Sequence, residues 1–110
     1  MLTGFYVLRG TGAAKFTRTF LRVGLSATFF VQVLELIGSP TDLTVFVEHK
    51  NADDAAFTTA GSFATISSVS VASLSVSALK EQVRLSLNSV ATNAWEGFYV
   101  LVPEPAWRPY

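Results

Sequence analysis

The sequence contains no cysteine and only one histidine, His49. Without cysteine, the chain has neither a disulfide framework nor a thiolate metal site. A hydrolase triad would need the single histidine to meet a serine and a carboxylate in space. No Gly-x-Ser-x-Gly elbow or comparable signature accompanies it. We therefore expect no enzymatic activity, no catalytic residue, no bound metal and no cofactor.

Charge is scarce as well. Only 15% of the residues are charged, against a usual share of about 25%. The eight basic residues balance the eight acidic ones, whereas a nucleic-acid-binding protein needs a basic face to neutralise phosphates. The middle of the chain is acidic, and the first third is basic through Arg9, Lys15, Arg18 and Arg22. We interpret these charges as solvated surfaces and as complementarity between copies, and we expect no nucleic-acid partner.

Long hydrophobic runs are missing too. A membrane helix needs about 18 consecutive apolar residues, and Gln32 and Glu35 interrupt the run that begins at Phe29. The start of the chain lacks the basic region and the apolar stretch of a signal peptide. We expect neither a membrane partner nor export by the standard secretory route.

The chain does contain strong two-residue alternation. It is clearest in residues 43–50 and 80–88, and a period of two is typical of a half-buried β-strand. Seven or eight short strands separated by turns predict an all-β antiparallel sandwich or a jelly-roll-like barrel, in one domain spanning residues 1–110. The predicted core positions include Val45, Val47, Val83 and Leu85.

Apolar residues exceed what such a small domain can enclose. Half of the residues are hydrophobic and nine are phenylalanine. We therefore expect part of the apolar surface to lie at an interface with other chains, including copies of this chain in a homo-oligomer.

The two ends of the chain are predicted to be arms that reach such partners, although residues 5–8 predict either a short strand or an extended arm. Residues 1–15 form the possible N-terminal arm. Residues 103–110 form the C-terminal arm, because three prolines in seven positions disfavour helix and central strand. Residues of the types that dominate interfaces are the candidate contacts. They are Trp107, Arg108 and Tyr110 in the C-terminal arm, and Phe16, Arg18, Phe20 and Arg22, which alternation places on one face.

The serine-rich stretch before residue 77 changes phase. Val69 and Val71 fall on odd positions, whereas Ala72, Leu74 and Val76 fall on even ones. A one-residue phase change predicts a bulge or a turn near Val71 and Ala72.

Two binding sites compete with structural interpretations. Asp42, Asp53 and Asp54 are a candidate calcium site if their loops share one end of the sandwich, although a plain polar loop is the favoured explanation. Four aromatic residues are either a carbohydrate platform or core and subunit contacts. They are Trp95, Tyr99, Trp107 and Tyr110.

Three blocks of the sequence carry a family resemblance. They are LTVFVEHKNADDAAFTTAGSFATI (residues 43–66), LKEQVRLSL (residues 79–87) and WEGFYVLVPEPAWRPY (residues 95–110). Together they resemble small β-sandwich virion structural proteins of tailed bacteriophages. The resemblance implies no catalytic residue. It implies a capsid decoration protein that binds the lattice of the major capsid protein. The implied partners are the major capsid protein or other virion proteins, and the implied location is a virion assembled in the host cytoplasm. Two alternatives remain open: another virion component (tail, connector or baseplate), and a carbohydrate-binding β-sandwich module.

Overall fold

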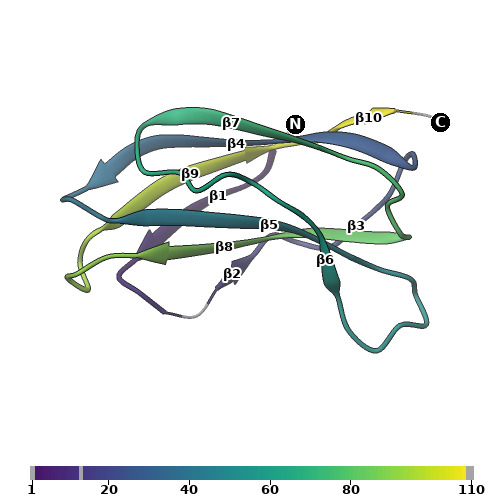
Figure 1. The fold of residues 1–110 in the computed structure, drawn as a ribbon, viewed down its shortest axis with the longest axis horizontal. Coiled ribbons are helices and arrows are strands. Elements are labelled where there is room, and N and C mark those ends of the chain that lie inside the picture. The colour runs from purple at the N-terminus through teal and green to yellow at the C-terminus, as the bar shows by residue number, and fades with distance from the viewer. Residues whose placement is uncertain (1, 13, 109–110) are drawn as a thin grey trace.

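The computed structural model describes residues 2–12 and 14–108, and these residues form ten strands and no helix (Figure 1). The all-β prediction is confirmed. The strands are β1 (Leu2–Arg9), β2 (Lys15–Phe16), β3 (Phe20–Leu21), β4 (Ser26–Ile37), β5 (Asp42–Lys50), β6 (Thr58–Ser62), β7 (Ser70–Val76), β8 (Gln82–Val90), β9 (Gly97–Pro103) and β10 (Ala106–Arg108).

The strands form two antiparallel sheets. In the first sheet the order is β1-β9-β4-β7, and β10 also pairs with β4. In the second sheet the order is β2-β8-β5-β6, and β3 also pairs with β8. Because β2 and β3 lie along β8, and β9 and β10 lie along β4, each pair is one interrupted strand. The result is two four-stranded sheets in the strand order of a jelly roll, which is the fold class predicted from the sequence.

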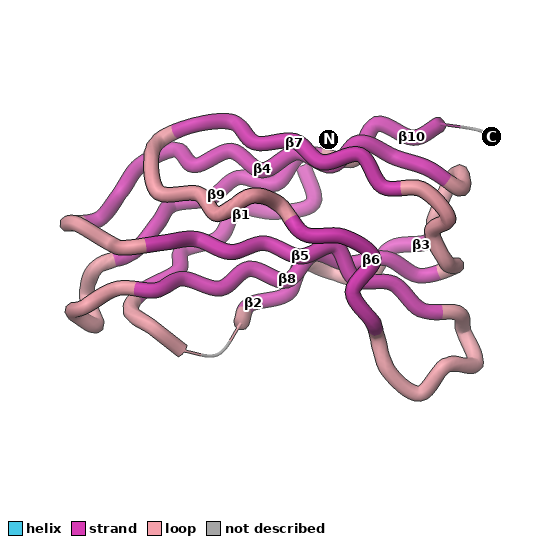
Figure 2. Tube along the Cα trace, in the orientation of Figure 1, coloured by secondary structure: helices cyan, strands magenta, loops and turns pink. Residues whose placement is uncertain are grey.

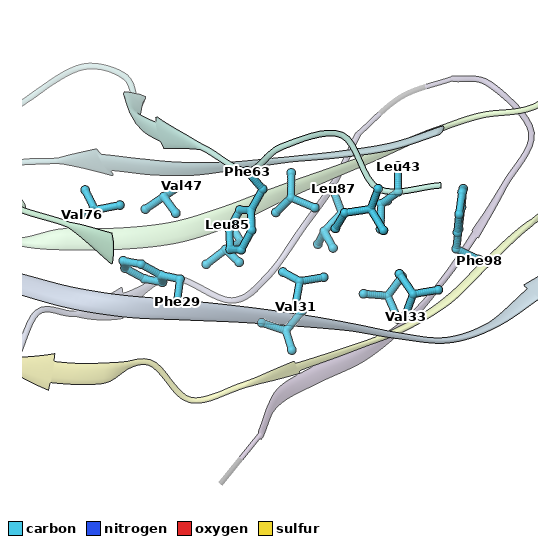
Figure 3. Close-up of a cluster of buried hydrophobic side chains, with 14 of the residues drawn as sticks. Phe29, Val31, Val33, Leu43, Val47, Phe63, Val76, Leu85, Leu87 and Phe98 are labelled. Carbon is cyan, nitrogen blue, oxygen red and sulfur yellow. The ribbon is translucent and has the colours of Figure 1, made fainter. Parts of the chain in front are cut away.

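The core lies between the two sheets, and Figure 3 shows side chains from both sheets pointing into it. Alternating side chains produce this core, because buried and less buried residues alternate from Ser26 to Val33 of β4, over the first part of β5, and along most of β8 and β9. The four predicted core positions, Val45, Val47, Val83 and Leu85, are at most 1% exposed. That prediction is confirmed.

Strand β7 has no bulge, so the sequence prediction there is wrong. Its pairing with β4 runs without a register shift from Ser70 to Val76. Ala72 and Leu74 pack against the core, whereas Val69 and Val71 are 60% and 65% exposed. The phase change in the sequence therefore comes from apolar residues on the outer face and not from an extra residue in the strand.

The predicted arms are also wrong for the described residues, because both terminal segments pair within the first sheet. Strand β1 pairs with β9 from Leu2 to Arg9. Strand β10 pairs with β4, although Pro103 and Pro105 flank the break before it. Proline cannot donate to a sheet ladder, so pairing stops at the prolines and resumes once they are passed. Strand β10 lies at an edge, where a nearby proline is tolerated.

Loops gather at the two ends of the sandwich, as Figure 2 shows. The β4–β5, β8–β9 and β1–β2 connections lie at one end. The β3–β4, β5–β6 and β7–β8 connections lie at the other (Figure 2).

Candidate protein-binding surface

The outer face of the first sheet is largely apolar over β1, β9 and β4 and reaches β7 at Val71, whereas the other exposed residues of β7, Ser73 and Ser75, are polar. Phe5, Leu101, Gln32 and Val71 occupy one row, because each is paired in register with the next. Only Gln32 in this row is polar. The outward side chains on both sides of the row extend it. We call this surface the apolar face, and it consists of Phe5, Val7, Phe30, Gln32, Leu34, Val71, Tyr99 and Leu101.

The apolar face is open to solvent. Phe5, Leu34 and Val71 are 52%, 39% and 65% exposed. The Phe5 and Tyr99 rings stack on it, with centroids 6.0 Å apart and an angle of 25° between their planes. From strand spacing and rise, four strands of about seven residues present roughly 450 Å² in projection. A patch of this size on a small domain is often functional.

Charge lies at the two ends of this sheet. The charged residues of β1, β4, β7 and β9 are Arg9 and Glu35. They pair with Gly97 and Tyr99 of β9, close to the end where that strand begins. At the other end, Arg108 of β10 pairs with Ser26 at the start of β4, so only a partner that covers the middle of the apolar face meets no charge.

The outer face of the second sheet is different, because it carries two charged side chains that pair with each other. Arg84 lies directly opposite Glu48, and its Nε donates to Glu48 Oε1 at 2.8 Å. The guanidinium lies over the Phe16 ring at 3.9 Å and over the Phe57 ring at 4.0 Å. Cation–π stacking from both sides holds β2 and the β5–β6 loop over β8. Phe16 therefore makes a contact within its own chain, with the Arg84 guanidinium.

The predicted interface residues of the first third do not share a face. Phe16 is 47% exposed on the outside of the second sheet, whereas Phe20 packs against the core. Between them, Thr17 is buried, with its N–H donating to the Leu85 carbonyl and its Oγ1 accepting from the Leu85 N–H. These two hydrogen bonds to β8 interrupt the alternation of inward and outward side chains between Phe16 and Phe20. The prediction that Phe16, Arg18, Phe20 and Arg22 share one face is therefore wrong. Of the two arginines, Arg18 is exposed and Arg22 donates from Nη1 to the Leu79 carbonyl.

Trp107 also belongs to the protein's own interior. Its ring meets the Phe20 ring at 6.2 Å and 81°, and the Phe29 ring at 6.3 Å and 72°. Edge-to-face contacts of this kind stabilise aromatic clusters. The prediction that Trp107 anchors a free arm is wrong. Tyr110 lies outside the described residues.

Arg108 is exposed and lines an open hollow of about 410 Å³. The hollow is also lined by Ser26, Ala27, Ser75, Val76 and Ser77. No described contact fixes the Arg108 guanidinium there, and we assign the hollow no ligand.

The predicted calcium and sugar sites are not assembled. Asp42 begins β5, whereas Asp53 and Asp54 follow its end, so a nine-residue strand of about 30 Å separates them. Asp54 instead accepts from the Asn51 N–H at 2.8 Å and pairs with Lys80 at 3.6 Å. That backbone hydrogen bond, followed by the Lys80 charge, lowers the pKa of the Asp54 carboxyl. Within residues 2–12 and 14–108, no three carboxylate or histidine side chains gather as a metal site.

The three described aromatic residues of the sugar hypothesis, Trp95, Tyr99 and Trp107, do not form one platform either. Trp107 faces the core, and Tyr99 belongs to the apolar face. Trp95 is 58% exposed on the β8–β9 loop, where its ring lies against Gly38.

His49 has a structural role. Its Nδ1 accepts from the Lys80 N–H at 3.2 Å, which joins β5 to the segment before β8. Burial, and then the nearby Lys80 charge, lower the pKa of His49, and Asp54 opposes them. Burial and the Lys80 charge both favour the neutral imidazole, and a neutral imidazole can accept this backbone hydrogen bond at Nδ1.

Glu96 is a residue that sequence reasoning missed. It is 6% exposed, and its Oε2 accepts from the Ser39 N–H at 2.8 Å. Its Oε1 accepts from the Asn93 N–H at 3.0 Å and from Asn93 Nδ2 at 3.1 Å. These bonds, with Ser39 first, lower the pKa of the carboxyl. The Glu96 carbonyl also accepts from the Gly10 N–H at 2.7 Å, so one residue joins three connections at one end of the sandwich.

No family model, no curated protein and no solved structure matches this chain. In the part of the chain that the structure describes, no helix is long and apolar enough to cross a membrane.

Proposed function

We propose that this protein is a structural component of a tailed-phage virion, a decoration protein that binds the lattice of the major capsid protein. Its role is to hold other chains together, and no catalytic role is proposed. The observation that carries the proposal is the apolar face of the first sheet, which spans β1, β9 and β4, reaches β7 at Val71, and is free of charge between its two ends. The sequence resemblance of residues 43–110 supplies the virion context.

The contrast between the two sheets supports an orientation on the capsid. The second sheet carries the Arg84–Glu48 ion pair, whose side chains are 25% and 19% exposed and would lose their remaining contact with water under a partner. The apolar face loses little by leaving water, since burying apolar area contributes about 25 cal/mol per Å². We therefore place the first sheet on the capsid shell and the second sheet outward.

The experiment is a co-sedimentation assay with empty shells of the major capsid protein encoded in the same genome. The matched variants are Phe5→Lys on the apolar face and Phe46→Lys on the outside of the second sheet, where the phenylalanine is 38% exposed. We expect wild type and Phe46→Lys to sediment with the shells, and Phe5→Lys to remain in the supernatant.

Two results would contradict the proposal. If wild type does not bind the shells, the protein is not a decoration protein of that capsid. If both variants bind equally well, a surface other than the apolar face makes the contact. Circular dichroism of each variant shows whether a loss of binding reflects a loss of folding.

A further inference from the structure

Strand β7 forms an open edge of the first sheet. It pairs with β4 along its whole length, and no strand among residues 2–12 and 14–108 pairs with its other side. Strand β6 approaches β7 only from below, where Gly61 lies against the inward side chains of Leu74 and Val76. The outer row of N–H and C=O groups of β7 is thus available to another strand.

The edges formed by β1, by β2 and β3, and by β6 carry features that discourage pairing with another strand. On β1, a register shift follows Leu2, and Lys15 Nζ donates to the Val7 carbonyl at 2.7 Å. The edge formed by β2 and β3 is divided into two pieces of two residues each. On β6, a register shift interrupts the pairing with β5 between Val47 and Glu48.

Strand β7 has none of these features. Its sequence is SVASLSV, with no proline, no charge and no register shift. The nearest charged residues along the chain are Asp54 and Lys80, so residues 55–79 are free of charge. Valine favours strand conformation, and the outward positions near the middle of β7 carry small side chains.

We propose that β7 pairs antiparallel with β7 of a second copy of this chain, about a two-fold axis at Ser73. Two-fold pairing places each residue opposite a residue of the same strand, so any charge near the axis would face its own copy. In β7, Ser73 faces Ser73 and Val71 faces Ser75, which introduces no charge and no large side chain. A second copy is therefore a better occupant than a charged partner strand.

Such a dimer would join two first sheets into one continuous sheet. Its two apolar faces would lie side by side and present about 900 Å² in projection. A single partner would therefore meet about twice the apolar area that one copy presents, which favours a stable contact. This consequence rests on the proposed function, whereas the dimer itself does not.

The test measures mass in solution with no capsid present, by sedimentation velocity and light scattering over a concentration series. We expect wild type to have twice the monomer mass of 11.9 kDa. The variant Ser73→Lys places two like charges opposite each other across the axis, and its dissociation constant should rise at least about tenfold. The control is Ser62→Lys on β6, an exposed serine at an edge of the second sheet, which should dimerise like wild type.

Hydrogen exchange supplies a second readout that depends on the strand itself. Amides of β7 should exchange more slowly as the wild-type concentration rises, and this dependence should vanish in Ser73→Lys. The inference is overturned if wild type stays at 11.9 kDa up to about 1 mM, where even a weak contact is populated. It is also overturned if Ser73→Lys dimerises unchanged, or if Phe5→Lys abolishes the dimer while Ser73→Lys does not. The co-sedimentation assay has a separate outcome, so the two proposals can fail independently.

Discussion

Replacing Trp107 with alanine tests whether the C-terminal strand belongs to the domain or reaches outside it. The half-buried indole removes roughly 150 Å² from water, worth about 4 kcal/mol at 25 cal/mol per Å². A compact unfolded state lowers this gain by about a quarter. Loss of the two edge contacts with Phe20 and Phe29 adds about 1 kcal/mol. We expect Trp107→Ala to cost about 3–5 kcal/mol of unfolding free energy, the usual range for a large aromatic residue.

The measurement is urea unfolding followed by far-UV circular dichroism, with thermal unfolding beside it. For a domain of this size, the expected cost lowers the melting temperature by about 12 °C or more. Trp95→Ala is the matched control, because it deletes the same side chain from a loop where 58% of it is exposed. We expect the control to remain within about 0.5 kcal/mol of wild type.

Equal stabilities for the two tryptophan variants would refute this reasoning. That result would mean that Trp107 contributes nothing to the fold in solution, and that the segment after Pro105 is released from β4. A large loss in Trp107→Ala alone would establish β10 as part of the domain.

Two further predictions concern backbone packing and pH. Gly97→Ala should prevent folding or cost about 4 kcal/mol or more, because the new Cβ would lie 1.7 Å from the Leu8 carbonyl oxygen, whereas Gly12→Ala, with no atom within 4 Å, should melt like wild type. Melting curves that coincide for the two variants would show that β1 and β9 are farther apart than described. The pKa of His49 lies below its ordinary value of 6.5, so the unfolded chain takes up more protons and stability should fall as pH drops from 6.5 toward 5. In urea unfolding at these pH values, His49→Gln should lose this dependence, and an unchanged slope would assign it to another group.

Strands β5 and β8 were predictable because each has one buried face and one more exposed face. That difference makes apolar and polar residues alternate in the sequence. The outward valine of β7 disturbed the pattern, because an apolar residue on an outer face imitates a core residue. The C-terminal strand was missed for another reason. Pro103 and Pro105 are local signals of irregular structure, but the free side of β4 that accepts Ala106–Arg108 is a property of the assembled sheet.

The sequence predicted that an exposed apolar surface exists, but it did not predict which residues form it. Composition indicated more apolar area than one domain can enclose, and the apolar face agrees with that. The individual residues proposed for it came from local patterns of aromatic residues and arginine. Phe20 and Trp107 then proved to contact each other inside the domain. Glu96 could not have been found, since its hydrogen-bond partners at Gly10 and Ser39 are brought to it by the fold alone.

The position of β4 has a consequence for synthesis of the chain. This twelve-residue strand is completed at Ile37, yet both of its neighbours come later: β7 begins at Ser70, and β9 begins at Gly97. At a synthesis rate of about 5–20 residues per second, the first partner is delayed by roughly 2–7 s and the second by longer. During that interval β4 has been synthesised and neither of its edges has a partner. We expect nascent chains in which β4 has left the ribosome and β7 has not to be the species that recruit chaperones, and the yield of folded protein to depend on how quickly translation passes this stage.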